Sequence, residues 1–293
     1  MKKIIFSLFL ITSLGVNAQI LNVKSTTKVD VPTGVKVSTA QLSPDGNWVV
    51  ISHKSTLGLD KLDLSTNKIT RISDTGNGFD LKIANDNKTV IFRESNYGAD
   101  KRRFTTLKSV NVATGATNVI SPTTRDTRAF AGATAKTLKA NAGTINSSTT
   151  LPVASINRGS MYVTQNGITT LVAPQGVEGK SYLWPQVSPD GKKILYFVVG
   201  EGCFVCNIDG SNPVAQGVLR ASVWYDNNTI VGMDHKDDGV KTTSSKLIAK
   251  RVDNSATQVL TTTSVKAMYP STGNGKISFV TPEGELFLLN VSK

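Results

Sequence analysis

Short apolar runs, each bounded by a polar turn, recur from one end of this chain to the other. Two stretches are nearly copies of each other: 42–51, LSPDGNWVVI, and 187–196, VSPDGKKILY. In each, Pro sets φ at a turn position, Asp can hydrogen-bond the backbone two residues further on, and Gly accepts a positive φ. Each stretch therefore predicts a strand, a tight turn and a second strand.

The same frame returns in weaker form elsewhere in the chain. The Asp, or the residue in its place, falls at positions 45, 86, 134, 190, 226 and 273. These positions are about 46 residues apart on average, a period that suits a four-stranded propeller blade. The copy at 131–138 has lost Pro, Asp and Gly and is assigned only from its neighbours. The sequence thus predicts an all-β protein, a six-bladed β-propeller.

A second turn, rich in Asn, Asp and Gly, follows in five of the units, at 64–69, 112–117, 164–168, 208–212 and 252–257. Such residues between apolar runs mark short hairpin loops, here from the third strand of a blade to its fourth. The sixth copy is missing, whereas 20–31 forms an additional strand before the first repeat. We therefore expect the N-terminal strand to join the last blade and close the ring, which leaves only short, protected edges. A pair of β-sandwiches shares these strand and turn statistics but does not explain the period.

The first segment has the features of a cleavable secretory signal. Lys2 and Lys3 precede an apolar run at 4–14, and VNA at 16–18 places small residues where a signal peptidase cuts. A membrane anchor needs about 20 apolar residues, and no Cys follows the run to carry a lipid. The sequence therefore predicts a signal peptide at 1–18, a single propeller domain at 19–293, and a periplasmic or secreted product that does not span a membrane.

The net charge of the chain indicates which classes of binding partner are to be expected. The formal charge of +12 drops by two when Lys2 and Lys3 are removed. In a cytosolic protein this excess would suggest nucleic acid, but export leaves lipid headgroups, cell-wall polymers or acidic proteins as the available polyanions. We therefore expect no nucleic-acid partner. The scattered Lys residues are also explained by the simpler need to keep a Thr-rich β-protein soluble.

The two cysteines, Cys203 and Cys206, lie in a segment that is typical of a strand. Residues three apart in a strand point to opposite faces, so a disulfide between them would be strained and two packed thiols are expected instead. We expect no cofactor and no metal. Two His without a third ligand make a poor zinc site, and the Asp residues at 234–238 match no calcium loop.

Residues 184–196 (WPQVSPDGKKILY), followed by 206–211 (CNIDGS), resemble the Pro-Asp propeller repeat of the TolB family, and residues 37–51 match it as well. Prolyl-peptidase-like enzymes use a similar repeat. TolB also carries an α/β domain before its propeller, and prolyl peptidases carry a hydrolase domain with a nucleophile elbow; neither is found in this sequence. The resemblance therefore implies a free-standing periplasmic propeller. By analogy, its partner would be an envelope protein of the peptidoglycan-associated lipoprotein type.

The loops from second to third strands share one face of a propeller with the blade-to-blade connections. Polar and aromatic candidates for binding fall on those predicted loops: His53, Arg93, Glu94, Tyr97, Glu201, Asp234 and His235. Aromatic and Arg residues there would anchor a protein partner, so a protein-binding or scaffolding module with no catalytic residues is favoured. Two alternatives stay open: a glycan or small ligand bound in the channel, or a hydrolase. In a hydrolase, Glu94, Glu201 and Asp234 would meet across the channel mouth as paired carboxylates.

Aromatic residues also fall on the predicted channel-lining strands, at Tyr182, Trp184, Trp224 and Tyr269. Trp184 and Trp224 both precede a repeat turn and are interpreted as equivalent positions. We expect both to be packing residues, which would leave the irregular loops to carry the function.

We predict that the mature protein begins at Gln19. Expressed in a bacterium with an outer membrane, the chain should be recovered from the periplasm with an intact mass lacking residues 1–18. Ala18→Arg should block cleavage, because the peptidase requires a small residue at that position. An uncut wild-type chain in the cytosol would contradict the prediction.

Overall fold

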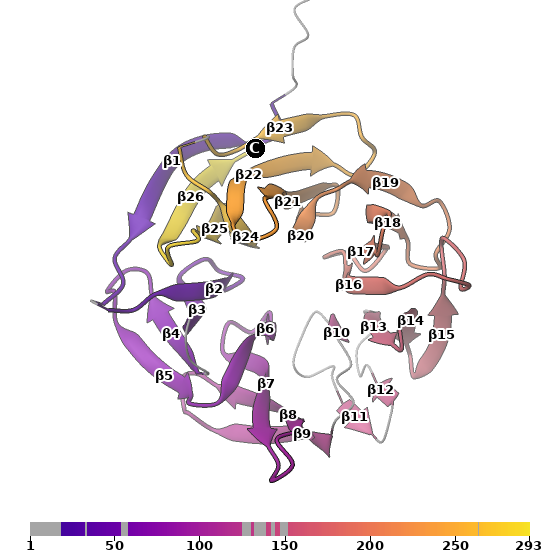
Figure 1. Ribbon diagram of the computed structural model, residues 1–293, viewed down its shortest axis with the longest axis horizontal. Helices are drawn as coiled ribbons and strands as arrows, with labels where there is room; N and C mark the ends of the chain where they lie inside the picture. The colour runs from indigo at the N-terminus through magenta and orange to yellow at the C-terminus, as the bar shows by residue number, and fades with distance from the viewer. Residues whose placement is uncertain are drawn as a thin grey trace, which may run out of the picture.

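The computed structural model describes residues 19–32, 34–53, 58–124, 130–131, 139–141, 144–146, 152–262 and 264–293. The predicted signal peptide at 1–18 and most of the predicted turn at 131–138 lie outside these residues. Within the described ranges every regular element is a strand, and no helix has the length and hydropathy needed to cross a membrane. Six four-stranded sheets form a ring around a central channel, as predicted (Figure 1).

The strands of a blade follow one another from the channel outward. The first blade holds β2 (Val37–Leu42), β3 (Trp48–His53), β4 (Leu59–Asp63) and β5 (Ile69–Ser73). The second holds β6 (Gly76–Ile83), β7 (Thr89–Tyr97), β8 (Arg103–Asn111) and β9 (Thr117–Thr124). The fourth holds β16 (Tyr182–Val187), β17 (Lys193–Val198), β18 (Gly202–Asn207) and β19 (Val214–Gly217). The fifth holds β20 (Arg220–Asp226), β21 (Thr229–Asp237), β22 (Thr242–Arg251) and β23 (Thr257–Val259).

The third blade is complete but carries an insertion. Its sheet has the order β10 (Phe130–Ala131), β13 (Val153–Asn157), β14 (Ser160–Gln165) and β15 (Ile168–Val172). Between its first and second strands lies a separate two-stranded sheet, β11 (Lys139–Asn141) with β12 (Thr144–Asn146). The insertion explains why the repeat is least regular in this part of the sequence.

The last blade is closed by the N-terminal strand, which confirms the predicted ring closure. Its sheet contains β24 (Met268–Gly273), β25 (Lys276–Val280), β26 (Leu286–Ser292) and, outermost, β1 (Asn22–Val29). β1 runs antiparallel to β26 along its length. Its start is anchored on the fifth blade, where the Gln258 side-chain oxygen accepts hydrogen bonds from the backbone N–H groups of Ile20 and Leu21, both at 2.8 Å. The Gln258 amide donates in return to the Leu21 carbonyl at 2.7 Å.

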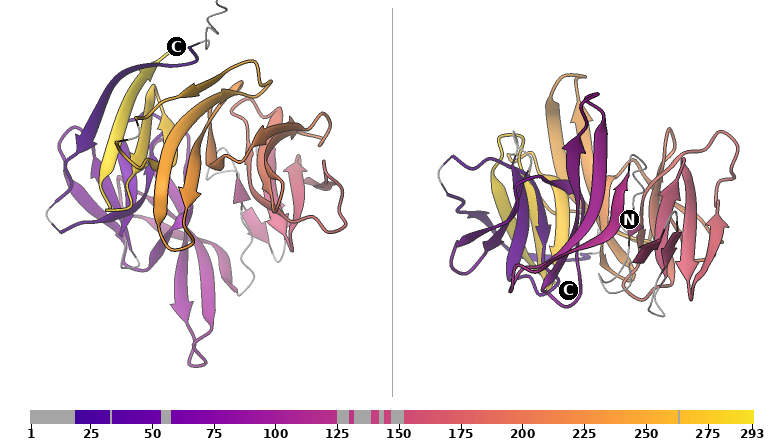
Figure 2. Two further views of the ribbon diagram at one scale, coloured as in Figure 1. Left: turned by 45° about the horizontal axis from the view of Figure 1, so that its top comes forward. Right: turned by 90° about the horizontal axis from the view of Figure 1, so that it is seen from below.

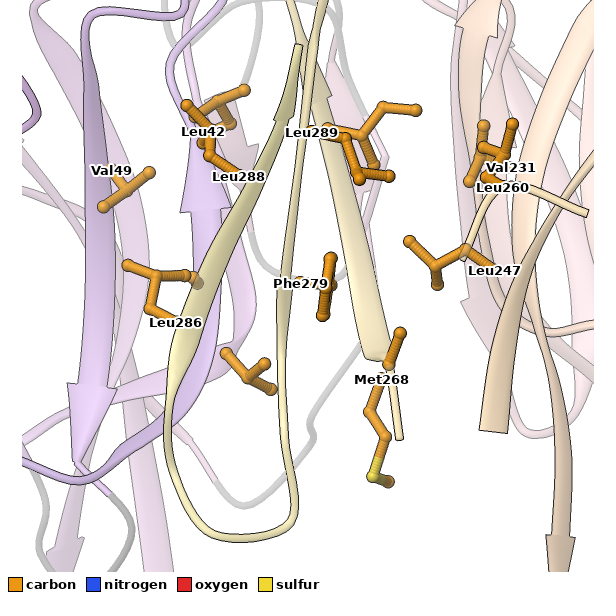
Figure 3. Close-up of a cluster of buried hydrophobic side chains, with 14 of the residues drawn as sticks. Leu42, Val49, Val231, Leu247, Leu260, Met268, Phe279, Leu286, Leu288 and Leu289 are labelled. Atoms are coloured by element: carbon orange, nitrogen blue, oxygen red, sulfur yellow. The ribbon is translucent and has the colours of Figure 1, made fainter. Parts of the chain in front are cut away.

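The inner strands are apolar on both faces because each blade is covered by a neighbour on either side. In β3, Val49 and Ile51 pack with the last blade, whereas Trp48 and Val50 pack with the second. Successive residues of a strand point to opposite faces, so one short apolar run serves two interfaces. The largest buried cluster joins the fifth, sixth and first blades around Phe279 (Figure 3).

The two cysteines obey the same alternation. Cys206 packs with Tyr196, and Cys203 packs on the other side of β18 with Trp224. Both are buried and free, as the sequence predicts. Burial raises the pKa of the Cys203 thiol to about 11 and that of Cys206 to about 12, so both thiols stay protonated at neutral pH.

The repeat turn also forms hydrogen bonds that connect neighbouring blades. The Asp45 carboxylate accepts a hydrogen bond from the serine hydroxyl two residues before it, at 2.6 Å. The backbone N–H of Asp45 donates to the Asn87 side chain of the second blade, at 2.9 Å. Asp190 is held in the same way, with the serine at 2.6 Å and Asn227 of the fifth blade at 3.0 Å. We call this side of the ring, where first strands turn into second strands, the turn face.

We predict that ring closure depends on the buried Leu21. Leu21→Ala should lower the free energy of unfolding by about 2–5 kcal/mol, the range for buried leucines, as measured by urea denaturation of the mature protein. Leu171→Ala is the matched control, because this leucine is exposed on the outer strand β15. The control should change the free energy by less than about 0.5 kcal/mol. Equal losses in the two variants would argue against the anchoring role.

Candidate functional site

The strand directions assign the remaining loops to one side of the ring. First strands run toward the turn face, so second-to-third-strand hairpins and blade-to-blade connections lie opposite, on what we call the hairpin face. Two hairpins, β7–β8 and β21–β22, extend furthest from this face (Figure 2). They belong to the second and fifth blades, which lie across the channel from each other (Figure 1). The channel mouth therefore has two opposed arms.

The seven predicted candidates lie at the strand ends and loops of this face. His53 ends β3, and Arg93, Glu94 and Tyr97 lie in the outer half of β7. Glu201 lies between β17 and β18, and Asp234 and His235 lie in β21. None of the seven lines the central cavity, and Arg93 is buried. The structure thus places them on one side but does not gather them into one site.

Both histidines sit beside carboxylates of their own blade. His53 Nε2 contacts the buried Asp60 carboxylate, whose other oxygen lies 2.9 Å from Arg71 Nε. His235 Nε2 lies 3.4 Å from Asp237. Asp60 thus links His53 and Arg71 within one blade. The sequence did not reveal this structural role, because the three residues come from three different strands.

The three carboxylates considered for hydrolysis come from three different blades, and none of them lines the cavity in the channel. Glu94 forms an ion pair with Lys108, and Glu201 forms one with Lys180. Burial acts to raise the pKa of Glu94, but the hydrogen bond and charge of Lys108 help to lower it below the usual value. Asp234 is exposed. Among the described residues, no three His, Cys, Asp or Glu side chains gather as metal ligands.

A cavity of about 480 Å³ lies in the channel, toward the fourth and fifth blades. First strands of five blades contribute to its wall: β2, β6, β16, β20 and β24. The charged residues that line it are two cations, Lys82 and Arg220, and the described lining contains no carboxylate. Arg220 is exposed, and its side chain forms no ion pair or hydrogen bond with the part of the chain that the structure describes. The channel wall therefore presents an uncompensated positive charge.

Two aromatic residues stand on this wall in a strained backbone conformation. Trp184 and Tyr269 occupy β-bulges of β16 and β24, with φ of 50° and 54°. Residues other than glycine pay about 1–2 kcal/mol for this left-handed conformation. Trp184 is 56% exposed and Tyr269 is 42% exposed, so burial does not offset the strain. Strain of this kind is concentrated at functional sites.

The expectation for the two tryptophans is correct only for Trp224. Trp224 is buried, and its indole N–H donates to the Gln186 carbonyl of the fourth blade at 3.0 Å. Trp184 is not its equivalent: the bulge position of Trp184 is matched by Ala221 and Tyr269, which share its positive φ. The sequence held a signal for the match between Trp184 and Tyr269 in the Trp-Pro and Tyr-Pro pairs at 184–185 and 269–270, but not for the positive φ, since Pro favours an extended residue before it.

Exposed apolar side chains also gather on the hairpin face. Of the eleven large exposed hydrophobic residues that are described, seven lie on its loops or at the channel mouth: Tyr97, Val177, Trp184, Val199, Val218, Val240 and Tyr269. The other four, Val119, Ile168, Leu171 and Val259, lie on outer strands at the rim. The hairpin face is thus the more apolar of the two faces.

The sequence matches no protein-family model and no curated protein. Solved structures do resemble it. A putative TolB from Agrobacterium tumefaciens has a TM-score of 0.56 at 13% identity, covering 89% of this chain and 92% of that one. An oligogalacturonate lyase in complex with manganese has a TM-score of 0.52 at 15% identity, covering 88% and 78%. The Pyrococcus horikoshii acylaminoacyl peptidase has a TM-score of 0.51 at 12% identity, covering 86% and 43%. At these identities the likeness shows the propeller fold alone.

We predict opposite sensitivities for the two tryptophans. Trp184→Gly should change the free energy of unfolding by less than about 1 kcal/mol, because glycine accepts the positive φ and little burial is lost. Trp224→Gly should lower it by more than about 3 kcal/mol, because a buried aromatic side chain is deleted. Urea denaturation followed by circular dichroism measures both. A large loss for Trp184→Gly would show that its ring is part of the packing after all.

Proposed function

We propose that this chain is an exported propeller of the cell envelope whose hairpin face docks a protein partner. The observation that carries the proposal is the gathering of seven exposed apolar side chains on that face. A face that carries most of the exposed large apolar side chains is a candidate interaction surface, and aromatic residues such as Tyr97 often contribute strongly to binding energy at interfaces.

The two arms add charge to this surface. The β7–β8 hairpin carries the Lys101-Arg102-Arg103 cluster, whereas the β21–β22 hairpin carries Asp234, Asp237 and Asp238 interspersed with Lys236 and Lys241, so that it is only slightly acidic. Complementary charges fix the orientation of a partner and speed its association. A partner with an acidic patch on one side and a basic patch on the other would bind in a single orientation.

The TolB-like assignment belongs to this proposal. Its support is the Pro-Asp repeat at 184–196 together with the fold likeness to a putative TolB. On this basis we infer an envelope protein of the peptidoglycan-associated type as the partner. The cavity in the channel favours a second candidate function, the binding of a small ligand or chain end. The two functions are compatible, because Arg220 and Tyr269, at the hairpin-face ends of β20 and β24, belong to the cavity wall.

The docking surface is tested by paired variants of the mature protein. The hairpin-face variant carries Tyr97→Ser and Val240→Ser, and the rim variant carries Ile168→Ser and Val259→Ser. All four side chains are exposed, so neither variant should lose stability. Capture of envelope proteins should fall about tenfold or more for the hairpin-face variant, as for loss of an interface hot spot, and stay at the wild-type level for the rim variant.

Site-specific photo-crosslinking supplies the control. A crosslinker at position 97 should label one partner, and a crosslinker at position 168 should not. Equal capture by both variants, or the same products from both positions, would refute docking through the hairpin face.

A further inference from the structure

The channel cavity is large enough for a single residue at the end of a polypeptide, but too small for the surface of a folded protein. Its volume of about 480 Å³ lies within the range of about 300–1,000 Å³ that is usual for small-ligand pockets. The exposed Val199 and Val218 lie on neighbouring loops of the same face. An extended segment that crosses this apolar surface would place its last residue in the cavity.

The cation that faces the cavity without a partner favours an anionic ligand. Lys82 and Arg220 are the charged residues of the lining; Lys82 is engaged elsewhere in the protein, whereas Arg220 has no carboxylate partner among the described residues. A guanidinium offers N–H groups in a planar fork that matches a carboxylate in two parallel hydrogen bonds. A ligand that fills the cavity displaces water from such a pair and so strengthens it.

The aromatic residues provide a rigid apolar wall beside this charge. The Trp184 ring lies against Phe197, with ring centroids 5.5 Å apart and planes tilted by 50°. Because the bulge fixes the Trp184 backbone and Phe197 supports its ring, little conformational entropy is lost when a ligand packs against it. Tyr269 presents a second ring from the last blade. The strain at both bulges is thus the cost of a preformed surface.

Several neutral polar side chains of the wall are already engaged by the protein. The Gln186 amide donates to the Ser222 carbonyl at 2.8 Å, and the Ser222 hydroxyl donates to the Leu219 carbonyl at 3.3 Å. Thr39 shares a hydrogen bond with Ser52 at 2.7 Å. Gln41 is left as the one uncharged amide of the wall without such a bond among the described residues. A ligand with one anionic end and an apolar body needs little beyond Arg220 and the rings, and it suits this wall better than a ligand with many hydroxyl groups.

From these observations we propose that the cavity binds the carboxyl-terminal residue of a polypeptide, with its carboxylate on Arg220 and its apolar side chain against Trp184 and Tyr269. The inference deepens the proposed docking function and rests on it, since the chain end would belong to the docked partner. It assigns the channel to recognition of one residue and the hairpin arms to the rest of the partner.

Trp184 itself reports on binding, because the other two tryptophans, Trp48 and Trp224, are buried. The probe is the acetylated tetrapeptide Ala-Ala-Ala-Leu with a free carboxylate, titrated into the mature protein. We expect a saturable blue shift of tryptophan emission and protection from acrylamide quenching. The carboxyl-terminal amide of the same peptide should bind at least tenfold more weakly. Trp184→Phe should abolish the signal, which confirms its origin.

Arginine variants separate recognition from general charge. Arg220→Gln should weaken binding of the acid peptide at least tenfold and remove the preference for acid over amide, and Arg220→Lys should restore part of that preference. Arg158→Gln is the matched control, because Arg158 is an exposed arginine of the β13–β14 hairpin that does not line the cavity. It should bind like the wild type.

Three results would overturn the proposal: equal affinity for acid and amide, no binding of either, or binding of acetate or glucuronate as tight as that of the peptide acid. The last result would identify a site for simple carboxylates or for sugar acids. Failure here is distinguishable from failure of docking. If capture remains sensitive to the hairpin-face variant while no peptide acid binds, docking stands and this inference falls.

Discussion

The pairing of β1 with β26 is the constraint on which the rest of the molecule depends. It joins the two ends of the chain in one sheet and so sets the number of blades and the width of the channel. Five of the eight residues of β1 are exposed, so the strand itself brings little apolar burial and relies on the buried Leu21 beside it. The junction between the last blade and the first is held separately by Ser271, whose hydroxyl accepts the Leu42 N–H at 2.9 Å, and by Lys276, which donates to the Gly46 carbonyl at 2.7 Å.

The two faces of the closed ring differ in how strongly their loops are constrained by hydrogen bonds. On the turn face, Asp45 and Asp190 make the same hydrogen bonds within their own blade and to an Asn of the next blade. A turn that must satisfy its own backbone and its neighbour tolerates little variation. The hairpin face has no such requirement, and its loops differ in length, charge and exposure from blade to blade. Such loops on a rigid scaffold are where binding residues collect, while the scaffold itself does not specify a function.

Sequence reasoning succeeded wherever a local pattern determines structure. The spacing of the Ser-Pro-Asp-Gly turns predicted the six blades, and the unmatched N-terminal strand predicted that the ring closes in the last blade. Strand alternation predicted that Cys203 and Cys206 point to opposite faces of their sheet. It failed for Trp184, because Trp184 lies six residues before Asp190 whereas Trp224 lies only two residues before Asp226, and Trp184 falls in the bulge between Leu183 and Gln186. It also placed the seven candidate residues together on the hairpin face, but it did not identify the residues that pair with them. Ion pairs such as His53 with Asp60 join different strands, and their geometry is set by packing rather than by spacing.

The positive charge of the channel is not simply the excess charge of the chain. On the hairpin face the carboxylates of Glu94 and Glu201 are each neutralised by a lysine, so the acidic groups nearest the ring are compensated where they stand. Arg220 is left without such a partner among the described residues. A cation in a concave wall with apolar neighbours focuses its field into the cavity. The proposed recognition of an anion therefore depends on Arg220 itself and not on the net charge of the chain.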